Sequence, residues 1–497
     1  MTENPPNSLH ELIHSLTPGE RRNFIQLANY SRVSYKQYLT LFSILSKMKM
    51  YNEVKLQQKL EKSKVKTPLP VLSNYLQNLL LAALRFYHSG EGAEAKIMEC
   101  LHNADILHAK GLSKLRDKSL SKAKTLATEL EKPALLAEIV NKEWQYQSVF
   151  LAKDVQAFSF ILTDLKKLLH FRELNYLQSI LLSKGEIRDD ELRQEWESLI
   201  ANPLLSEETS RVSYEEVYHF HHIMMRYNFR INNFSECVKH QENLIQHMES
   251  REALLLNYKE LYMFELNGLV VAYCQNMELE AANQTNNKLL NVQKWDLTTR
   301  EVNVLQDIIS ISYSNLIHGC FIENAIQNAL TYAEQAEVFL QRNKVSSFQK
   351  AFLYLNLAKA CIYREKYHDA LMWNNKILNA PTDNKRDDFF ILSWIFNLVI
   401  HFELKHFGLL QYVTHSTYTF LKKRKKLYKT EHVILKYLKN KFPDAATHRE
   451  MIALFKKMKV EMEEIKKDPY EAKAFKYFDY TLWLKSKIEN TKLIDTL

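Results

Sequence analysis

The sequence predicts an all-helical protein: an α-solenoid of degenerate helical hairpins that follows a small N-terminal helical domain. The 497-residue chain contains 8 Gly and 10 Pro, whereas ordinary composition would give roughly 35 Gly and 25 Pro. Tight turns, hairpins and Gly-rich phosphate loops are therefore expected to be nearly absent, which excludes an all-β fold and disfavours a doubly wound α/β fold. Apolar residues also recur with helical periodicity between short polar turns.

Residues 1–88 are predicted to form the small N-terminal domain, which is basic. Two capping boxes of the S/T-x-x-E type, at residues 8–11 and 17–20, predict helices that begin near residues 9 and 18. Residues 89–92 hold two of the eight glycines, so we expect a flexible joint there. The remainder, residues 93–497, is assigned to the solenoid.

Weakly repeating helical hairpins are predicted in this second part. In the clearest unit Ala358 and Ala370 lie twelve residues apart, and small residues at such positions allow two antiparallel helices to pack closely. This unit resembles a tetratricopeptide repeat. An apolar residue that opens the second helix of a hairpin recurs at Leu112, Val155, Phe234, Leu279, Tyr367 and Phe407, with weaker candidates near residues 195 and 322. Neighbouring members of this series lie about 40 to 45 residues apart. That interval is longer than the ~34 residues of a regular tetratricopeptide repeat, so we predict eight or nine hairpins of long helices.

Stretches near both ends resemble an uncharacterised bacterial family of helical-repeat proteins. They are Ser15-Leu16-Thr17 with Glu20 and Phe24, residues 416–429 with Glu431, and residues 477–480 with Trp483-Leu484. The resemblance extends over nearly the whole chain. It implies a helical-repeat architecture and no particular chemistry.

The net charge of +9 is unevenly distributed along the chain. Residues 1–88 carry +7 and residues 405–441 carry +9, whereas residues 89–404 carry −8. Two basic regions therefore flank an acidic one, which suits an acidic partner or a contact between chains.

Targeting and cysteine patterns predict a cytoplasmic protein. The first residues lack the basic run and apolar core of a signal peptide. The most apolar stretch, residues 389–402, is shorter than the ~20 residues of a membrane-spanning helix. The five cysteines form no C-x-x-C pair, so reduced and mostly buried thiols are expected.

Two candidate partner-binding groups follow from residue spacing. Asn267, Asn356 and Asn397 lie 12, 11 and 10 residues before the anchors Leu279, Tyr367 and Phe407. They are predicted to line one groove, with Lys359 one turn from Asn356; chance placement of a common residue is the alternative. The second group is the basic run of Lys422, Lys423, Arg424, Lys425, Lys426 and Lys429. Interpreted as one helix, it is either a solvated helix end or a site for an acidic peptide or a phosphate backbone.

Motifs for catalysis and metal binding receive little support. His10-Glu11-Leu12-Ile13-His14 matches H-E-x-x-H, but a role of Glu11 in the capping box and a polar surface position for both histidines are preferred. His219 and His222, three residues apart, are compatible with a shared metal, although neutral surface histidines are the commoner outcome. Residues 90–95 match G-x-G-x-x-A after a helix instead of a strand, which indicates a linker. No cofactor, metal or catalytic residue is predicted.

The sequence therefore favours a non-enzymatic scaffold that binds a protein or peptide partner along a helical-repeat groove. The alternative is a nucleic-acid-associated regulator in which residues 1–88 contact nucleic acid and the repeats sense a ligand. No recognition helix rich in Arg, Asn or Gln supports that alternative.

Overall fold

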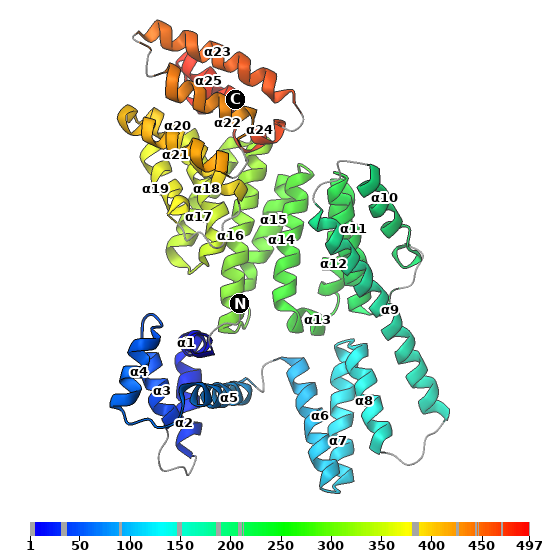
Figure 1. The fold of residues 1–497 in the computed structure, drawn as a ribbon. Helices are drawn as coiled ribbons and strands as arrows, with labels where there is room; N and C mark the ends of the chain where they lie inside the picture. Colours follow the sequence, from blue (N-terminus) through cyan, green and yellow to red (C-terminus); the bar gives the residue numbers. More distant parts are fainter. Residues whose placement is uncertain are drawn as a thin grey trace. The chain divides into compact units, whose positions relative to one another are not determined.

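In the computed structural model every regular element of the described residues is a helix, and the predicted all-α class is confirmed for them. Figure 1 shows these helices in chain order. No helix in these ranges has both the length and the apolarity to cross a membrane. The structure describes residues 5–30, 37–88, 92–146, 152–184, 190–206, 211, 213–379, 387–423, 427–442, 445, 447–468 and 471–496.

The chain divides into two compact units, residues 1–166 and 167–497. The division falls inside α9, a long helix at Ala152–Ser183. The first unit contains α1 Pro5–Ser15, α2 Pro18–Tyr30, α3 Gln37–Ser46, α4 Glu53–Lys62, α5 Leu69–Tyr87, α6 Ala93–Ala109, α7 Ser113–Glu129 and α8 Pro133–Tyr146. Two separate hydrophobic clusters, at residues 9–83 and 97–139, lie on either side of the predicted joint at residues 89–92.

The second unit continues with long helices that are paired by short turns. They are α10 Asp190–Ile200, α11 Tyr214–Arg230, α12 Phe234–Glu249, α13 Glu252–Asn257, α14 Lys259–Gln275, α15 Leu279–Asn291, α16 Thr299–Ile322, α17 Ile326–Arg342, α18 Ser347–Tyr363, α19 Tyr367–Leu378, α20 Asp387–Glu403, α21 Phe407–Lys423, α22 Lys429–Lys436, α23 His448–Lys466, α24 Ala472–Tyr477 and α25 Tyr480–Glu489. Short 3₁₀ segments occur at Pro203–Leu205, Val292–Lys294 and Leu493–Thr496, and a π-helical turn at Tyr437–Lys441.

Local start signals explain the first two helices, with one correction. The Thr17 capping box is confirmed, because Glu20 accepts from the Thr17 N–H at 2.6 Å while Thr17 Oγ1 accepts from the Glu20 N–H at 3.3 Å. The predicted start of a helix near residue 9 is wrong, since α1 begins at Pro5. Proline is favoured in a first helical turn, where its missing N–H costs no hydrogen bond. Ser8 therefore lies within α1 and is not its cap.

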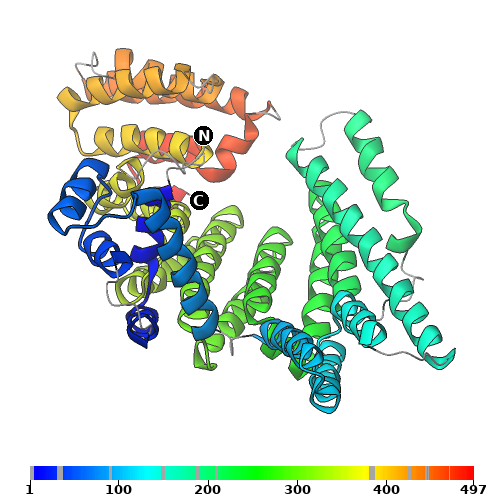
Figure 2. The same ribbon diagram turned by 60° about the horizontal axis from the view of Figure 1, so that its bottom comes forward.

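Hairpins of antiparallel helices follow one another through the second unit. The two helices of each pair contact each other in α11/α12, α14/α15, α16/α17, α18/α19 and α20/α21. The first helices also contact along the series, α14 with α16, α16 with α18, and α18 with α20. Figure 2 shows the same succession of helices from a second direction.

Most of the predicted anchors open a helix. Phe234, Leu279, Tyr367 and Phe407 are the first residues of α12, α15, α19 and α21, and α7 begins one residue after Leu112. Val155 differs, because α9 already begins at Ala152. The side chain of Val155 lies outside the described residues.

Left-handed residues close the turn between the two helices of these hairpins. They are Asn232, Met277, Asn324, Glu365 and Lys405, with φ between +57° and +65°. At each turn the next backbone N–H bonds the carbonyl five residues before it, as from Glu278 to Tyr273 at 2.9 Å, which is the Schellman arrangement. The expectation that few glycines mean few tight turns is therefore wrong at these helix ends.

Buried amide and hydroxyl groups connect neighbouring helices of the second unit. Each such bond joins two different helices, so it fixes the position of one helix along the other. The bonds are Gln178 Nε2 to Ile223 O at 2.8 Å, Gln241 Nε2 to Glu265 O at 3.0 Å, Ser312 Oγ to Asn286 Oδ1 at 2.8 Å, and Asn374 Nδ2 to Ser393 O at 3.0 Å.

Candidate partner-binding face

Lys359 is the most unusual side chain among the predicted binding residues. It lies on α18, is 4% exposed, and places Nζ 4.1 Å from the centre of the Phe321 ring on α16. In the part of the chain that the structure describes, no carboxylate pairs with it and no hydrogen bond reaches its ammonium group. A buried cation without a counter-ion is costly, and the aromatic ring compensates only part of that cost.

Burial determines the electrostatics around Lys359. It lowers the pKa of the ammonium group to about 7, because removal from water disfavours the charged form. His318 on α16 is affected as well: its own burial, reinforced by the nearby charge of Lys359, lowers its pKa to about 3. At neutral pH His318 is therefore uncharged, while Lys359 is protonated in a substantial fraction of molecules.

The three asparagines predicted to line the groove occupy buried or half-buried positions. Asn356 is 3% exposed and its Nδ2 donates to the Ser314 carbonyl on α16 at 3.1 Å. Asn397 on α20 and Asn267 on α14 each have a buried Oδ1 that no hydrogen bond reaches within the described residues. Asn356 thus connects two first helices, whereas the other two retain an unused acceptor.

The C-terminal part of the unit covers the same region. α24 contacts α16, and Tyr477 at its end stacks on His318 with ring centres 5.3 Å apart. Phe478 meets Tyr363 on α18 at 5.9 Å and Phe396 on α20 at 5.5 Å. We call this region, formed by His318, Phe321, Lys359 and Tyr363 and covered by Tyr477 and Phe478, the Lys359 face.

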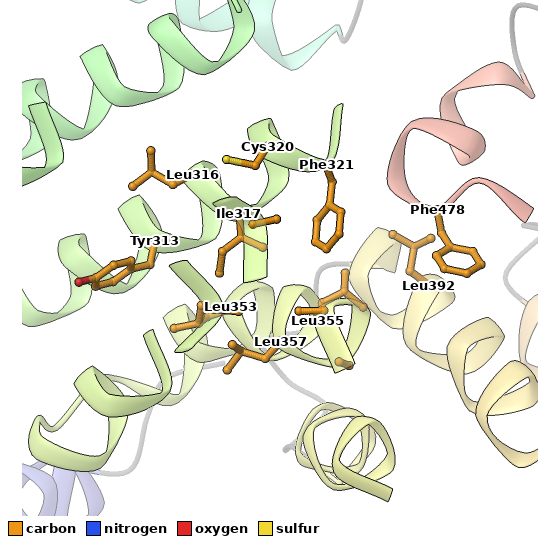
Figure 3. Close-up of a cluster of buried hydrophobic side chains, with 14 of the residues drawn as sticks. Tyr313, Leu316, Ile317, Cys320, Phe321, Leu353, Leu355, Leu357, Leu392 and Phe478 are labelled. Carbon is orange, nitrogen blue, oxygen red and sulfur yellow. The ribbon is translucent and has the colours of Figure 1, made fainter. Parts of the chain in front are cut away.

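The apolar surroundings of the Lys359 face appear in Figure 3, where Phe478 lies beside Leu392 of α20 and Phe321 lies near Leu355 of α18. All four side chains are buried. The combination of one cation, aromatic rings and an amide is suited to hold an anionic group of a ligand.

The basic run does not form one helix. α21 ends at Lys423 and α22 begins at Lys429, which corrects the interpretation as a single helix. Lys422 and Lys423 are exposed at the end of α21. Lys429 is bonded within the unit, since its Nζ lies 2.7 Å from Asp468 and its N–H donates to Glu471 at 2.9 Å. Arg424, Lys425 and Lys426 lie outside the described residues.

The H-E-x-x-H residues have a structural environment that sequence reasoning missed. His10 Nε2 lies 2.7 Å from the Met48 carbonyl and His14 Nε2 lies 3.1 Å from the Leu45 carbonyl, at the end of α3. His10 is buried, so its predicted polar surface position is wrong. Imidazole N–H groups satisfy carbonyls left free at a helix C-terminus. Only knowledge that α1 crosses α3 could have indicated these bonds.

The second histidine cluster is half-buried at His219, His221 and His222 and buried at His240. His221 Nδ1 lies 3.0 Å from His240 Nδ1, and His222 stacks on Tyr218. Burial, with smaller contributions from neighbouring positive groups, lowers the pKa values of His221 and His222 to about 3. Across the described ranges no three His, Cys, Asp or Glu side chains converge as metal ligands would.

The five cysteines are buried free thiols.

No family model matches the chain, and no curated protein matches it significantly.

Proposed function

We propose that this protein is a cytoplasmic, tetratricopeptide-like solenoid scaffold without enzymatic activity that binds a protein or peptide partner. The first helices of successive hairpins contact one another from α14 to α20, which supports a solenoid. Turns with left-handed residues recur at intervals of 40 to 47 residues between Asn232 and Lys405, which supports a common repeat unit. Stacked hairpins of this kind offer extended binding surfaces.

The observation that carries the proposal is the buried Lys359 ammonium without a counter-ion. The folded protein keeps this charge buried at a cost in stability, although Met or Leu would fill a similar volume without that cost. A partner carboxylate at the Lys359 face would supply the missing charge and form a strong charge-assisted bond. The proposed ligand is therefore an acidic peptide segment.

Access to the Lys359 face depends on the segment that covers it. Tyr477 and Phe478 occupy the face, so a partner competes with α24. Weakening the cover should strengthen binding, whereas removing the cation should weaken it. These opposite expectations distinguish a binding site from a merely structural contact.

Affinity capture with the full chain, followed by measurement of association and dissociation rates for the identified partner, tests the proposal. Lys359→Met should speed dissociation about tenfold or more, because a buried charge pair mainly determines the lifetime of a complex. Tyr477→Ala should tighten binding. The control Lys344→Met, at an exposed position, should change neither rate. A partner that binds Lys359→Met as tightly as wild type contradicts this site.

The exposed end of α21 has a separate expected role. Lys422→Glu with Lys423→Glu should slow association and reduce its salt dependence, because exposed charges act mainly on encounter rates. If deletion of residues 1–88 abolishes binding instead, the N-terminal domain is the binding module. Steep weakening with salt, linear in log concentration, would then favour the nucleic-acid alternative.

A further inference from the structure

An open groove of about 690 Å³ runs between α6 and α7 in the first unit. We call it the α6–α7 groove. Both helices contribute to its walls. Its lining consists of Asn103, Ile106, Leu107, Leu115, Lys118, Ser119, Ser121, Lys122 and Thr125.

Apolar side chains in this groove are accessible to solvent. Ile106 is 43% exposed and Leu115 is 53% exposed. Two of the three hydroxyl groups of the lining are already used, because Ser119 Oγ donates to the Cys100 carbonyl at 2.8 Å and Thr125 Oγ1 to the Ser121 carbonyl at 3.1 Å. The groove therefore offers apolar surface and leaves its lysines as the available charged groups.

Three lysines, Lys114, Lys118 and Lys122, follow one another by one turn of α7 and are exposed. None of them pairs with a carboxylate of the described residues, whereas Arg116 and Lys124 on the same helix pair with Asp117 and Glu143 at 2.7 Å. Like charges four residues apart repel and weaken a helix. Two of the three lysines, Lys118 and Lys122, line the groove itself.

We propose that the α6–α7 groove docks an amphipathic helix of a partner protein whose apolar stripe is flanked by Glu or Asp. The apolar stripe would cover Ile106 and Leu115, and the acidic flank would neutralise Lys118 and Lys122. Helices commonly bind in this way, with an apolar face in a groove between two helices. The groove belongs to the first unit and is independent of the Lys359 face.

A library of helical peptides tests the partner chemistry on the full chain. Each peptide has about 18 residues, a fixed Leu stripe, and flanking positions that encode Glu, Lys and Gln equally. Selection should enrich Glu over Lys at the flanks by about tenfold or more. Equal enrichment of Lys and Glu, or no enrichment of any peptide, overturns the proposal.

Matched variants locate the binding site of the most enriched peptide by fluorescence anisotropy. Lys118→Glu with Lys122→Glu should raise Kd about tenfold or more, and Leu115→Ser should raise it about as much. Lys96→Glu with Lys110→Glu makes the same charge change at exposed positions outside the lining, one on α6 and one directly after it. This variant should change Kd less than about twofold. Equal losses in the two double variants would show attraction to net charge alone and would contradict docking in the groove.

Discussion

Two helix junctions of the second unit bury polar side chains with different outcomes. Between α19 and α20, Asn374 Nδ2 donates to the Ser393 carbonyl at 3.0 Å and Asn374 Oδ1 accepts from Ser393 Oγ at 2.8 Å. Between α16 and α18, the Lys359 ammonium group lies over the Phe321 ring, and no hydrogen bond or ion pair from the described residues reaches it. A buried polar group with partners holds two helices together. A buried polar group without a partner destabilises the fold, so its presence requires another explanation.

Lys359→Met tests the unpaired side of this comparison and has the largest expected effect. The folded-state pKa of Lys359 is lowered to about 7, from an unfolded value near ~10.4. The cost of burial is therefore fully present below about pH 7 and fades as pH rises toward the unfolded pKa. At pH 6 the variant should be more stable by about 5 kcal/mol, measured by urea unfolding.

Repeating the urea series toward pH 10 supplies the internal control, because the gain should shrink there. The exposed Lys344→Met variant should show no such pH dependence. A gain for Lys359→Met that is equal at both ends of the pH range would mean that packing, and not charge, limits stability at this junction.

Asn374→Ala tests the paired side. Removal of the amide leaves Ser393 without its partner in a fully buried junction, and it also creates a small cavity. A loss of about 2 to 3 kcal/mol in unfolding free energy is expected. The neighbour Asn375 is exposed, so Asn375→Ala should lose no more than about 0.5 kcal/mol. Similar losses in both variants would refute a specific role for the Asn374–Ser393 exchange.

Glu431 extends the comparison to a buried acid. Its Oε2 is buried without a hydrogen-bond partner in the described structure, and burial together with the charge of Glu471 raises its pKa to about 7. A raised carboxyl pKa means that the folded state loses stability as pH rises from about 4.3 to 7. Glu431→Gln should therefore be more stable by roughly 3 kcal/mol at pH 8 and unchanged at pH 4.

Thermal unfolding across this pH range checks the Glu431 prediction. Exposed Glu489→Gln provides the matched control. A gain that is greater at pH 4 than at pH 8 has the wrong sign and would exclude Glu431 as the titrating group.

Residues with local determinants were predicted well from the sequence. Phe234, Leu279, Tyr367 and Phe407 open helices because each follows a turn whose geometry depends on a few neighbouring residues. The burial of Lys359 was not predictable in this way. Lys359 packs against Phe321 of another helix, and α24, more than a hundred residues later in the chain, covers the neighbouring His318. Helical periodicity alone does not reveal which helix covers which. His10 shows the same limit, because its partner Met48 lies on the segment after another helix.

Met277 and Glu365 provide the smallest test, since both adopt a left-handed conformation at equivalent turns. Met277 is 55% exposed, whereas Glu365 also accepts from the Leu493 N–H at 3.3 Å. Glycine removes the steric cost of the left-handed residue, so Met277→Gly should stabilise the protein by about 1 kcal/mol, less the entropy that glycine adds to the unfolded chain. Glu365→Gly removes the same steric cost but loses the bond to Leu493, so its net change should be close to zero. Thermal unfolding of the two variants side by side measures the difference. Equal stabilisation would show that the Glu365–Leu493 bond contributes nothing, and that a tertiary partner does not distinguish these two turns.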